Sequence, residues 1–166
     1  MKYVFLMDPL ETVQMKKDTS FILMLGAKRK GHQVFYLPDG GIFLKDNRVH
    51  FHLTEVTPQQ KKEQPFILGK TLDLSEDDVD VIFVRSDPPF DAQYLLNTWL
   101  LDRIMRPIPI INKPSGIRTA NEKIWAMQFA SVIPKTFLSR NRRDLLNFIS
   151  QEKDVIAKPV NGFGGA

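Results

Sequence analysis

The stretches YVFLM at residues 3–7, DTSFILMLGAKRKG at 18–31 and VFYL at 34–37 decide the fold class. The first and third are short apolar runs containing Val and aromatic residues, typical of strands buried on both faces of a parallel sheet. Between them, Asp18 begins a helix N-cap, apolar residues recur at helical spacing, and Gly31 ends the helix. Strand, helix and strand in this order predict a βαβ unit with a right-handed crossover.

Hairpins and a second strand–helix–strand unit follow along the chain. Residues 40–74 contain short segments of alternating pattern on either side of a turn at Asp46-Asn47. This pattern predicts β-hairpins added to the main sheet. Residues 79–84 predict a buried strand, followed by a helix over about 92–105 and a strand over 108–111. We therefore expect residues 1–113 to form a doubly wound, Rossmann-like α/β domain with a parallel sheet.

A second segment begins after Asn112-Lys113-Pro114. Its pattern predicts helices near 121–129 and 143–149, and strands at 136–138 and 154–160. A glycine-rich loop directly after the last strand requires more chain to complete it. We therefore expect residues 114–166 to be the truncated beginning of another domain, at the front of a longer polypeptide.

Composition excludes several classes of protein. The 166 residues are 43% hydrophobic and 25% charged, which is typical of a globular domain rather than a disordered chain. The absence of cysteine excludes disulfides, thiolate zinc sites and a cysteine nucleophile. The first apolar run ends at Asp8 and Pro9, too early for a signal sequence, and no run approaches the roughly 20 apolar residues of a membrane span. We expect a cytoplasmic protein that binds no membrane.

The net charge of +4 comes from dispersed basic clusters such as Lys28-Arg29-Lys30. Nucleic-acid binders concentrate more charge on one element and interleave it with aromatic residues. A weak nucleic-acid binder stays open as an alternative, but we expect no nucleic-acid partner.

Candidate binding residues follow the strands, because ligands of open α/β sheets bind at the carboxyl ends of the strands. Residues 16–20 (KKDTS) combine lysines with a helix N-terminus, which suits a carboxylate or phosphate; the alternative is a solvated loop with an N-cap. Arg85 follows a buried strand, and its planar fork suits a carboxylate. The alternative is a rigid turn in which Arg85 pairs with Asp87 or Asp91. The adjacent prolines Pro88-Pro89 allow a cis bond there.

The end of the chain offers a candidate phosphate site. Lys158 precedes a glycine-rich loop by four positions, and glycine backbone can approach phosphates closely. The order does not match the P-loop, in which the lysine follows the glycines. Lys123 is either a second phosphate ligand or an ordinary surface lysine. His50 and His52 alternate on one face of a strand, where a metal pair is the less favoured alternative to exposed histidines.

Taken together, these motifs resemble prokaryotic glutathione synthetase, a ligase of the ATP-grasp group. The resemblance covers residues 3–166. Its anchors are Met7-Asp8-Pro9, Lys16-Lys17-Asp18 with Ser20-Phe21, Arg85 with Asp87-Pro88-Pro89-Phe90-Asp91, Asn112-Lys113-Pro114, Asn121-Glu122-Lys123, and Lys158-Pro159 with Gly162, Gly164-Gly165-Ala166. Ser86 and Asn161 depart from the pattern, in which a lysine and an aspartate are more usual.

The resemblance implies a substrate domain over 1–113, of the type that precedes an ATP-grasp domain, and the start of an ATP-grasp domain over 114–166. It implies ATP-dependent ligation of γ-glutamylcysteine with glycine through an acyl phosphate, giving glutathione, ADP and phosphate. The implied cofactors are ATP and Mg²⁺ or Mn²⁺, with no metal ligand in this fragment because the metal site lies beyond it. We therefore expect the fragment alone to be inactive.

The resemblance also implies residue roles. Expected to bind substrate are Asp18, Ser20, Arg85 and Asp87. Expected to bind ATP are Lys123, Lys158, Gly164 and Gly165. Gly162, Gly164 and Gly165 would form a catalytic loop that closes over the acyl phosphate.

Two other functions stay open. One is an ATP-grasp carboxylate–amine ligase with different substrates, and the other is a non-catalytic, nucleotide-binding Rossmann-like module. The absence of G-x-G-x-x-G after the first strand counts against the latter. In each case the partners are small molecules, and a homo-oligomer is left open.

Overall fold

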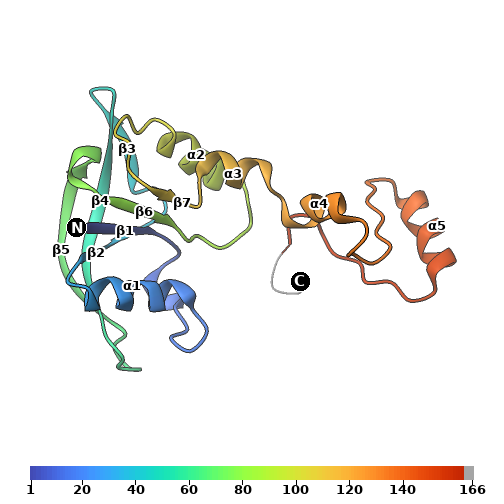
Figure 1. Ribbon diagram of the computed structural model, residues 1–166, viewed down its shortest axis with the longest axis horizontal. Coiled ribbons are helices and arrows are strands. Elements are labelled where there is room, and N and C mark those ends of the chain that lie inside the picture. Colours follow the sequence, from blue (N-terminus) through green and yellow to red (C-terminus); the bar gives the residue numbers. More distant parts are fainter. Residues whose placement is uncertain (163–166) are drawn as a thin grey trace. The chain divides into compact units, whose positions relative to one another are not determined.

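A computed structural model describes residues 1–162 of the chain. The chain divides into two compact units, Met1–Arg118 and Thr119–Ala166. The first is a mixed sheet with helices on both sides, and the second contains helices and loops (Figure 1). The expected α/β class is therefore confirmed.

The parallel part of the sheet lies around the first strand. β1 (Lys2–Leu6) pairs in parallel with β2 (Gln33–Leu37) on one side and with β6 (Val81–Val84) on the other. β7 (Ile110–Ile111) extends the sheet in parallel beyond β6. Val4, Phe5 and Leu6 are all buried, so both faces of β1 are covered, as its continuous apolar sequence predicts.

The remaining strands form the expected hairpins. β3 (Ile42–Lys45), β4 (Arg48–Pro58) and β5 (Phe66–Ser75) pair antiparallel, and β4 also pairs antiparallel with β2. Asp46 and Asn47 both have positive φ, 50° and 59°, which matches the twist of a tight two-residue hairpin turn. The sheet is therefore mixed, with a parallel region that continues into an antiparallel one.

Two helices cover opposite faces of the sheet (Figure 1). α1 (Thr19–Arg29) packs Phe21 and Met24 into one apolar cluster with Phe5, whereas α2 (Ala92–Leu101) contributes Leu101 to the other. Three shorter helices, η1 (Leu10–Thr12), η2 (Glu76–Asp78) and α3 (Pro114–Thr119), lie in the connections. No helix among residues 1–162 meets the length and apolarity needed to cross a membrane.

α2 ends about four residues earlier than predicted. The amides of Arg103 and Ile104 bond to carbonyls three residues back, which tightens the last turn. The amide of Met105 then donates to the buried carboxylate of Glu76 instead of continuing the helix. A contact with Glu76, far away in the sequence, thus ends this helix. The residues around the helix end do not predict this contact.

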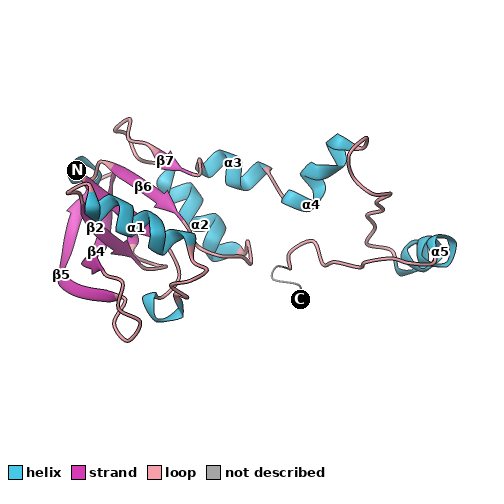
Figure 2. Ribbon diagram, turned by 60° about the horizontal axis from the view of Figure 1, so that its bottom comes forward, coloured by secondary structure: helices cyan, strands magenta, loops and turns pink. Residues whose placement is uncertain are grey.

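The second unit contains α4 (Glu122–Trp125), η3 (Ala126–Phe129) and α5 (Arg142–Glu152), so both predicted helices are present. The strands predicted at 136–138 and 154–160 are wrong, because these residues form no strand in the described chain (Figure 2). A strand needs neighbouring backbone to satisfy its N–H and C=O groups, and residues 119–162 provide no partner strand. Apolar side chains such as Val132 and Ile156 are about four-fifths exposed, at 79% and 83%.

Candidate functional site

A cavity of about 250 Å³ lies at the carboxyl ends of β1 and β6, beside the N-terminus of α1. β1 leads through α1 to β2 on one side, whereas β6 leads through α2 to β7 on the other. Ligand sites of open α/β folds occur where the strand order reverses in this way. The lining includes Asp8, Lys17, Ser20, Arg85 and Asp87.

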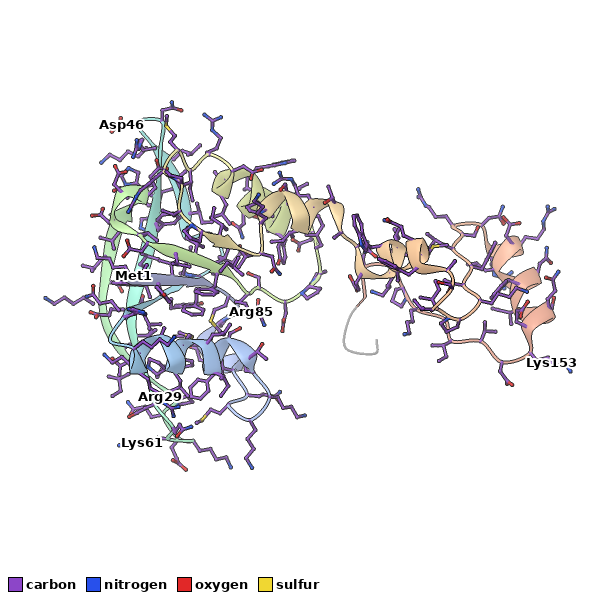
Figure 3. All side chains as sticks on the ribbon, in the orientation of Figure 1. Met1, Arg29, Asp46, Lys61, Arg85 and Lys153 are labelled. Carbon is purple, nitrogen blue, oxygen red and sulfur yellow. The ribbon has the colours of Figure 1, made fainter. Side chains whose placement is uncertain are left out.

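Arg85 is the central cation of this pocket, lying between the end of the sheet and α1 (Figure 3). Its Nε donates to Ser20 Oγ at 3.0 Å, and its Nη2 donates to Thr19 Oγ1 at 2.7 Å. Its backbone amide donates to Leu6 O at 2.7 Å, which fixes the residue to the end of β1. No carboxylate of residues 1–162 forms an ion pair with Arg85. The guanidinium is therefore hydrogen-bonded in place without being neutralised.

The alternative pairing of Arg85 with Asp87 or Asp91 is not observed. Asp91 instead caps α2, accepting the amides of Gln93 and Tyr94 at 3.0 Å each. The backbone amide of Asp87 donates to Asp8 Oδ2 at 3.0 Å, which ties the turn after β6 to the end of β1. The expectation that this turn allows a cis proline bond is confirmed at Pro88-Pro89.

Asp18 holds the first turn of α1 together. Its Oδ1 accepts the amides of Ser20 at 2.7 Å and Phe21 at 3.1 Å, so the predicted N-cap is confirmed. Its other carboxylate oxygen accepts no hydrogen bond from the described residues, and Asp18 is one of the residues that line the pocket. One carboxylate thus both orders the helix and contributes negative charge to the cavity.

This double role predicts different effects for two substitutions. Asp18→Ala removes the cap and should lower the free energy of unfolding by about 1 kcal/mol. Asp18→Asn keeps a capping oxygen and should stay within about 0.5 kcal/mol of the original chain. Urea denaturation of the three proteins measures this, and equal destabilisation by both substitutions would contradict the capping role.

Tyr94 supports the turn that carries Arg85. Its hydroxyl donates to the carbonyl oxygen of Ser86 at 3.3 Å. Burial raises the pKa of the Tyr94 hydroxyl, and the nearby negative charge of Asp8 raises it further. The hydroxyl therefore stays protonated and able to donate at neutral pH.

Residues to which the resemblance assigned no role also line or support the pocket. Asp8 follows the first strand directly, a signal available in the sequence, and Thr19 neighbours the predicted Ser20. Tyr94 lies in the first turn of α2, and no sequence signal distinguishes it from an ordinary helical aromatic. The structure thus brings Asp18, Ser20, Arg85 and Asp87 together around one cavity.

In the second unit, Lys123 reaches the segment that leads into the glycine-rich loop. Its Nζ donates to the carbonyl oxygens of Val160 at 3.1 Å and Gly162 at 2.6 Å, and to Glu122 Oε1 at 2.8 Å. Lys158 is exposed, with no hydrogen bond or ion pair to the described residues. Gly164 and Gly165 lie outside the described residues. Lys123 and Gly162 are therefore in contact, whereas the rest of the predicted loop is not placed.

The two histidines of β4 pack against an aromatic ring. His50 and His52 both stack on Phe43, with ring centroids 5.4 and 4.3 Å away. Nδ1 of His52 lies 2.5 Å from Asp73 Oδ1. Among residues 1–162, no group of three or more His, Cys, Asp or Glu side chains is arranged to hold a metal ion.

The fold and the cavity together define an α/β domain with a polar pocket at its switch point, lined by both carboxylates and cations, followed by a second unit. Residues 1–118 match the family described as "Prokaryotic glutathione synthetase, N-terminal domain". Residues 122–166 match "Prokaryotic glutathione synthetase, ATP-grasp domain". The chain belongs to the prokaryotic glutathione synthetase family, and the resemblance noted in the sequence is confirmed.

Individual relatives agree with this assignment. Glutathione synthetase of Escherichia coli (strain K12) is 35% identical over 166 residues, covering 99% of this chain and 52% of that protein. Glutathione synthetase of Buchnera aphidicola subsp. Baizongia pistaciae (strain Bp) is 36% identical over 162 residues, with coverages of 96% and 50%. That of Mesorhizobium japonicum is 34% identical, with coverages of 100% and 53%. The chain spans about half the length of the curated relatives it matches.

Proposed function

We propose that this chain is the substrate-binding part of an ATP-dependent ligase that joins γ-glutamylcysteine to glycine through an acyl phosphate, giving glutathione, ADP and phosphate. Residues 1–113 would form the substrate domain and 114–166 the beginning of the ATP-grasp domain. Membership of the glutathione synthetase family supports the reaction class. The structural observation that carries the proposal is the un-neutralised Arg85 guanidinium in the switch-point cavity.

The charges of the pocket suit a dipeptide that carries both carboxylates and an ammonium group. Arg85 would take a carboxylate of γ-glutamylcysteine, because its guanidinium is already oriented and has no acidic partner in the described chain. The carboxylate oxygen of Asp18 that does not cap the helix would accept a hydrogen bond from the ammonium group. Ser20 and Asp87 would complete the lining.

ATP would bind against the second unit. Lys158 is exposed and would contact the phosphates, while Lys123 would join it near the loop that begins at Gly162 and includes Gly164 and Gly165. Bound with ATP, Mg²⁺ or Mn²⁺ would supply positive charge to the phosphates. The protein residues would orient the phosphates and exclude water from the acyl phosphate.

The first test is calorimetric titration of the 166-residue chain with γ-glutamylcysteine. We expect binding of one dipeptide per chain, with no comparable binding of glycine alone. A panel of other dipeptides distinguishes this substrate from those of a related carboxylate–amine ligase. A chain that does not bind γ-glutamylcysteine would contradict the proposal.

The phosphate role of Lys158 predicts a large loss of turnover. The suitable protein continues residues 1–166 with the second half of the Escherichia coli relative, and the readout is ADP release that depends on γ-glutamylcysteine and glycine. Lys158→Ala should reduce this release roughly 100-fold, the size expected when one group that stabilises transition-state charge is lost. Lys62→Ala, an exposed lysine in the first unit, should change it less than about twofold.

The 166-residue chain by itself should release no ADP under the same conditions. Equal rates for Lys158→Ala and Lys62→Ala would contradict the assignment of Lys158. Tripeptide formed by the chain alone would contradict the expectation that the fragment is inactive.

A further inference from the structure

The geometry points to a specific way in which the pocket receives its ligand: we propose that Thr19 and Ser20 are positioning residues that hold Arg85 so that a carboxylate binds the end of the guanidinium. This inference rests on the proposed function of the pocket and goes beyond it. In this proposal the hydroxyls of Thr19 and Ser20 bind Arg85 and not the dipeptide, and the two terminal nitrogens of Arg85 face the dipeptide.

The hydrogen bonds of Arg85 occupy one edge of the guanidinium. A guanidinium has five N–H donors, and a carboxylate can bind two of them in parallel at either of two edges. One edge is formed by Nε and the nearer terminal nitrogen, Nη2, and the other by the two terminal nitrogens. Ser20 Oγ accepts from Nε at 3.0 Å and Thr19 Oγ1 from Nη2 at 2.7 Å, so the first edge is occupied. The edge formed by Nη1 and Nη2 is left for a ligand.

Both sides of this contact are anchored in the fold. Ser20 is only 3% exposed, and the next residue, Phe21, is buried in the apolar cluster beneath α1. Asp18 caps the same turn by accepting the amides of both residues. On the other side, the amide of Arg85 bonds to Leu6 O at the end of β1. The guanidinium is therefore ordered before the ligand arrives, which reduces the entropy lost on binding.

The hydroxyls orient Arg85 without cancelling its charge. A carboxylate in the same place would hold the guanidinium equally well but would compete with an anionic ligand. The hydroxyls of Thr19 and Ser20 are neutral acceptors, so they leave the charge of Arg85 without an ion-pair partner among the described residues. The same cavity is also lined by Lys17 and by the carboxylates of Asp8, Asp18 and Asp87. This arrangement favours a planar carboxylate approaching from the cavity.

A double-mutant cycle tests whether Thr19 acts through Arg85. Thr19→Val keeps the shape of the side chain and removes the hydroxyl. It should weaken γ-glutamylcysteine binding to the 166-residue chain about tenfold, the size expected for one hydrogen bond to a charged group. In an Arg85→Lys background, which lacks the planar fork, the same substitution should weaken binding less than about twofold. Calorimetry measures the tighter complexes, and NMR titration measures the weaker ones.

The matched control is Thr71→Val. Thr71 contributes its hydroxyl to a contact with Thr54 at 3.2 Å on the hairpins, outside the cavity lining. This variant should bind the dipeptide as the original chain does. Thermal unfolding of each variant separates lost binding from lost folding.

A second readout observes the contact without any ligand. The Nε–H proton of Arg85 should give a slowly exchanging NMR signal in the original chain, and this signal should exchange faster in Ser20→Ala. Unchanged exchange in Ser20→Ala would overturn the proposal.

The outcomes separate the two proposals. If Thr19→Val causes the same loss in both backgrounds, Thr19 binds the dipeptide directly and the positioning role is overturned while the proposed function survives. If the original chain binds no dipeptide, the proposed function itself is overturned, together with the end-on mode that rests on it.

Discussion

Arg85→Ala is expected to weaken the binding of γ-glutamylcysteine roughly 100-fold, or about 3 kcal/mol, which is the size of a lost charge-assisted pair of hydrogen bonds. The expectation follows from the position of Arg85 at the carboxyl end of β6, where its guanidinium contacts two neutral hydroxyls and no carboxylate of the described chain. Removing it leaves Lys17 and the carboxylates of Asp8, Asp18 and Asp87 as the charged groups of the cavity lining. Calorimetric titration of the 166-residue chain measures the change.

Two further variants complete the test: one separates the charge of Arg85 from its planar shape, and the other is a control outside the cavity. Arg85→Lys keeps a positive charge and loses the planar fork, so it should weaken binding about tenfold. Arg29→Ala removes an exposed arginine from the last turn of α1, outside the cavity lining, and should leave the affinity unchanged. An affinity for Arg85→Ala equal to that of the original chain would contradict the carboxylate role of Arg85.

Glu76→Ala is expected to lower the free energy of unfolding by about 3 kcal/mol, and the melting temperature by about 10 °C. Glu76 is completely buried. Its Oε1 forms an ion pair with Arg48 Nε at 3.1 Å and accepts a hydrogen bond from the amide of Met105 at 3.2 Å, and its Oε2 accepts one from the amide of Val49 at 3.4 Å. Removing the carboxylate leaves these donors without their partner, which costs more than the original contacts contribute.

The neighbouring residue provides a control of the same charge. Asp77 also pairs with Arg48, at 2.6 Å from Nη2, but its side chain is 64% exposed. Because exposed ion pairs contribute little, Asp77→Ala should lower the free energy of unfolding by less than about 1 kcal/mol. Thermal and urea denaturation of both variants test the contrast, and equal effects would show that burial of Glu76 is not the cause.

Several elements of the fold could be predicted because their signals are local. The apolar run of β1, the Asp18 cap of α1 and the Asp46-Asn47 turn each depend on residues close together in the chain. The end of α2 could not be predicted, since it depends on Glu76, which precedes it by more than twenty residues. The strands expected at 136–138 and 154–160 failed for a related reason, because pairing requires backbone from elsewhere.

In the pocket, too, local signals could be predicted and contacts between distant segments could not. The rule that ligands bind at the carboxyl ends of parallel strands pointed to residues 16–20 and to Arg85. The family resemblance then implied Asp18, Ser20, Arg85 and Asp87, which do line one cavity. The sequence could not distinguish an Arg85 that pairs with Asp87 or Asp91 from one that faces a ligand. That choice depends on three-dimensional contacts, in which Asp91 caps α2 and two hydroxyls of α1 take the guanidinium.

The sequence by itself determined the α/β class, the family and the residues that line the pocket. Strand periodicity, helix caps and ordered motifs each depend on residues within short segments. Only the tertiary structure decided how Arg85 is held, that Glu76 is buried, and that Lys123 reaches the carbonyls of Val160 and Gly162. Each of these depends on hydrogen bonds between residues at least 27 positions apart. Such contacts exist only after packing has brought distant segments together, and therefore no local pattern encodes them.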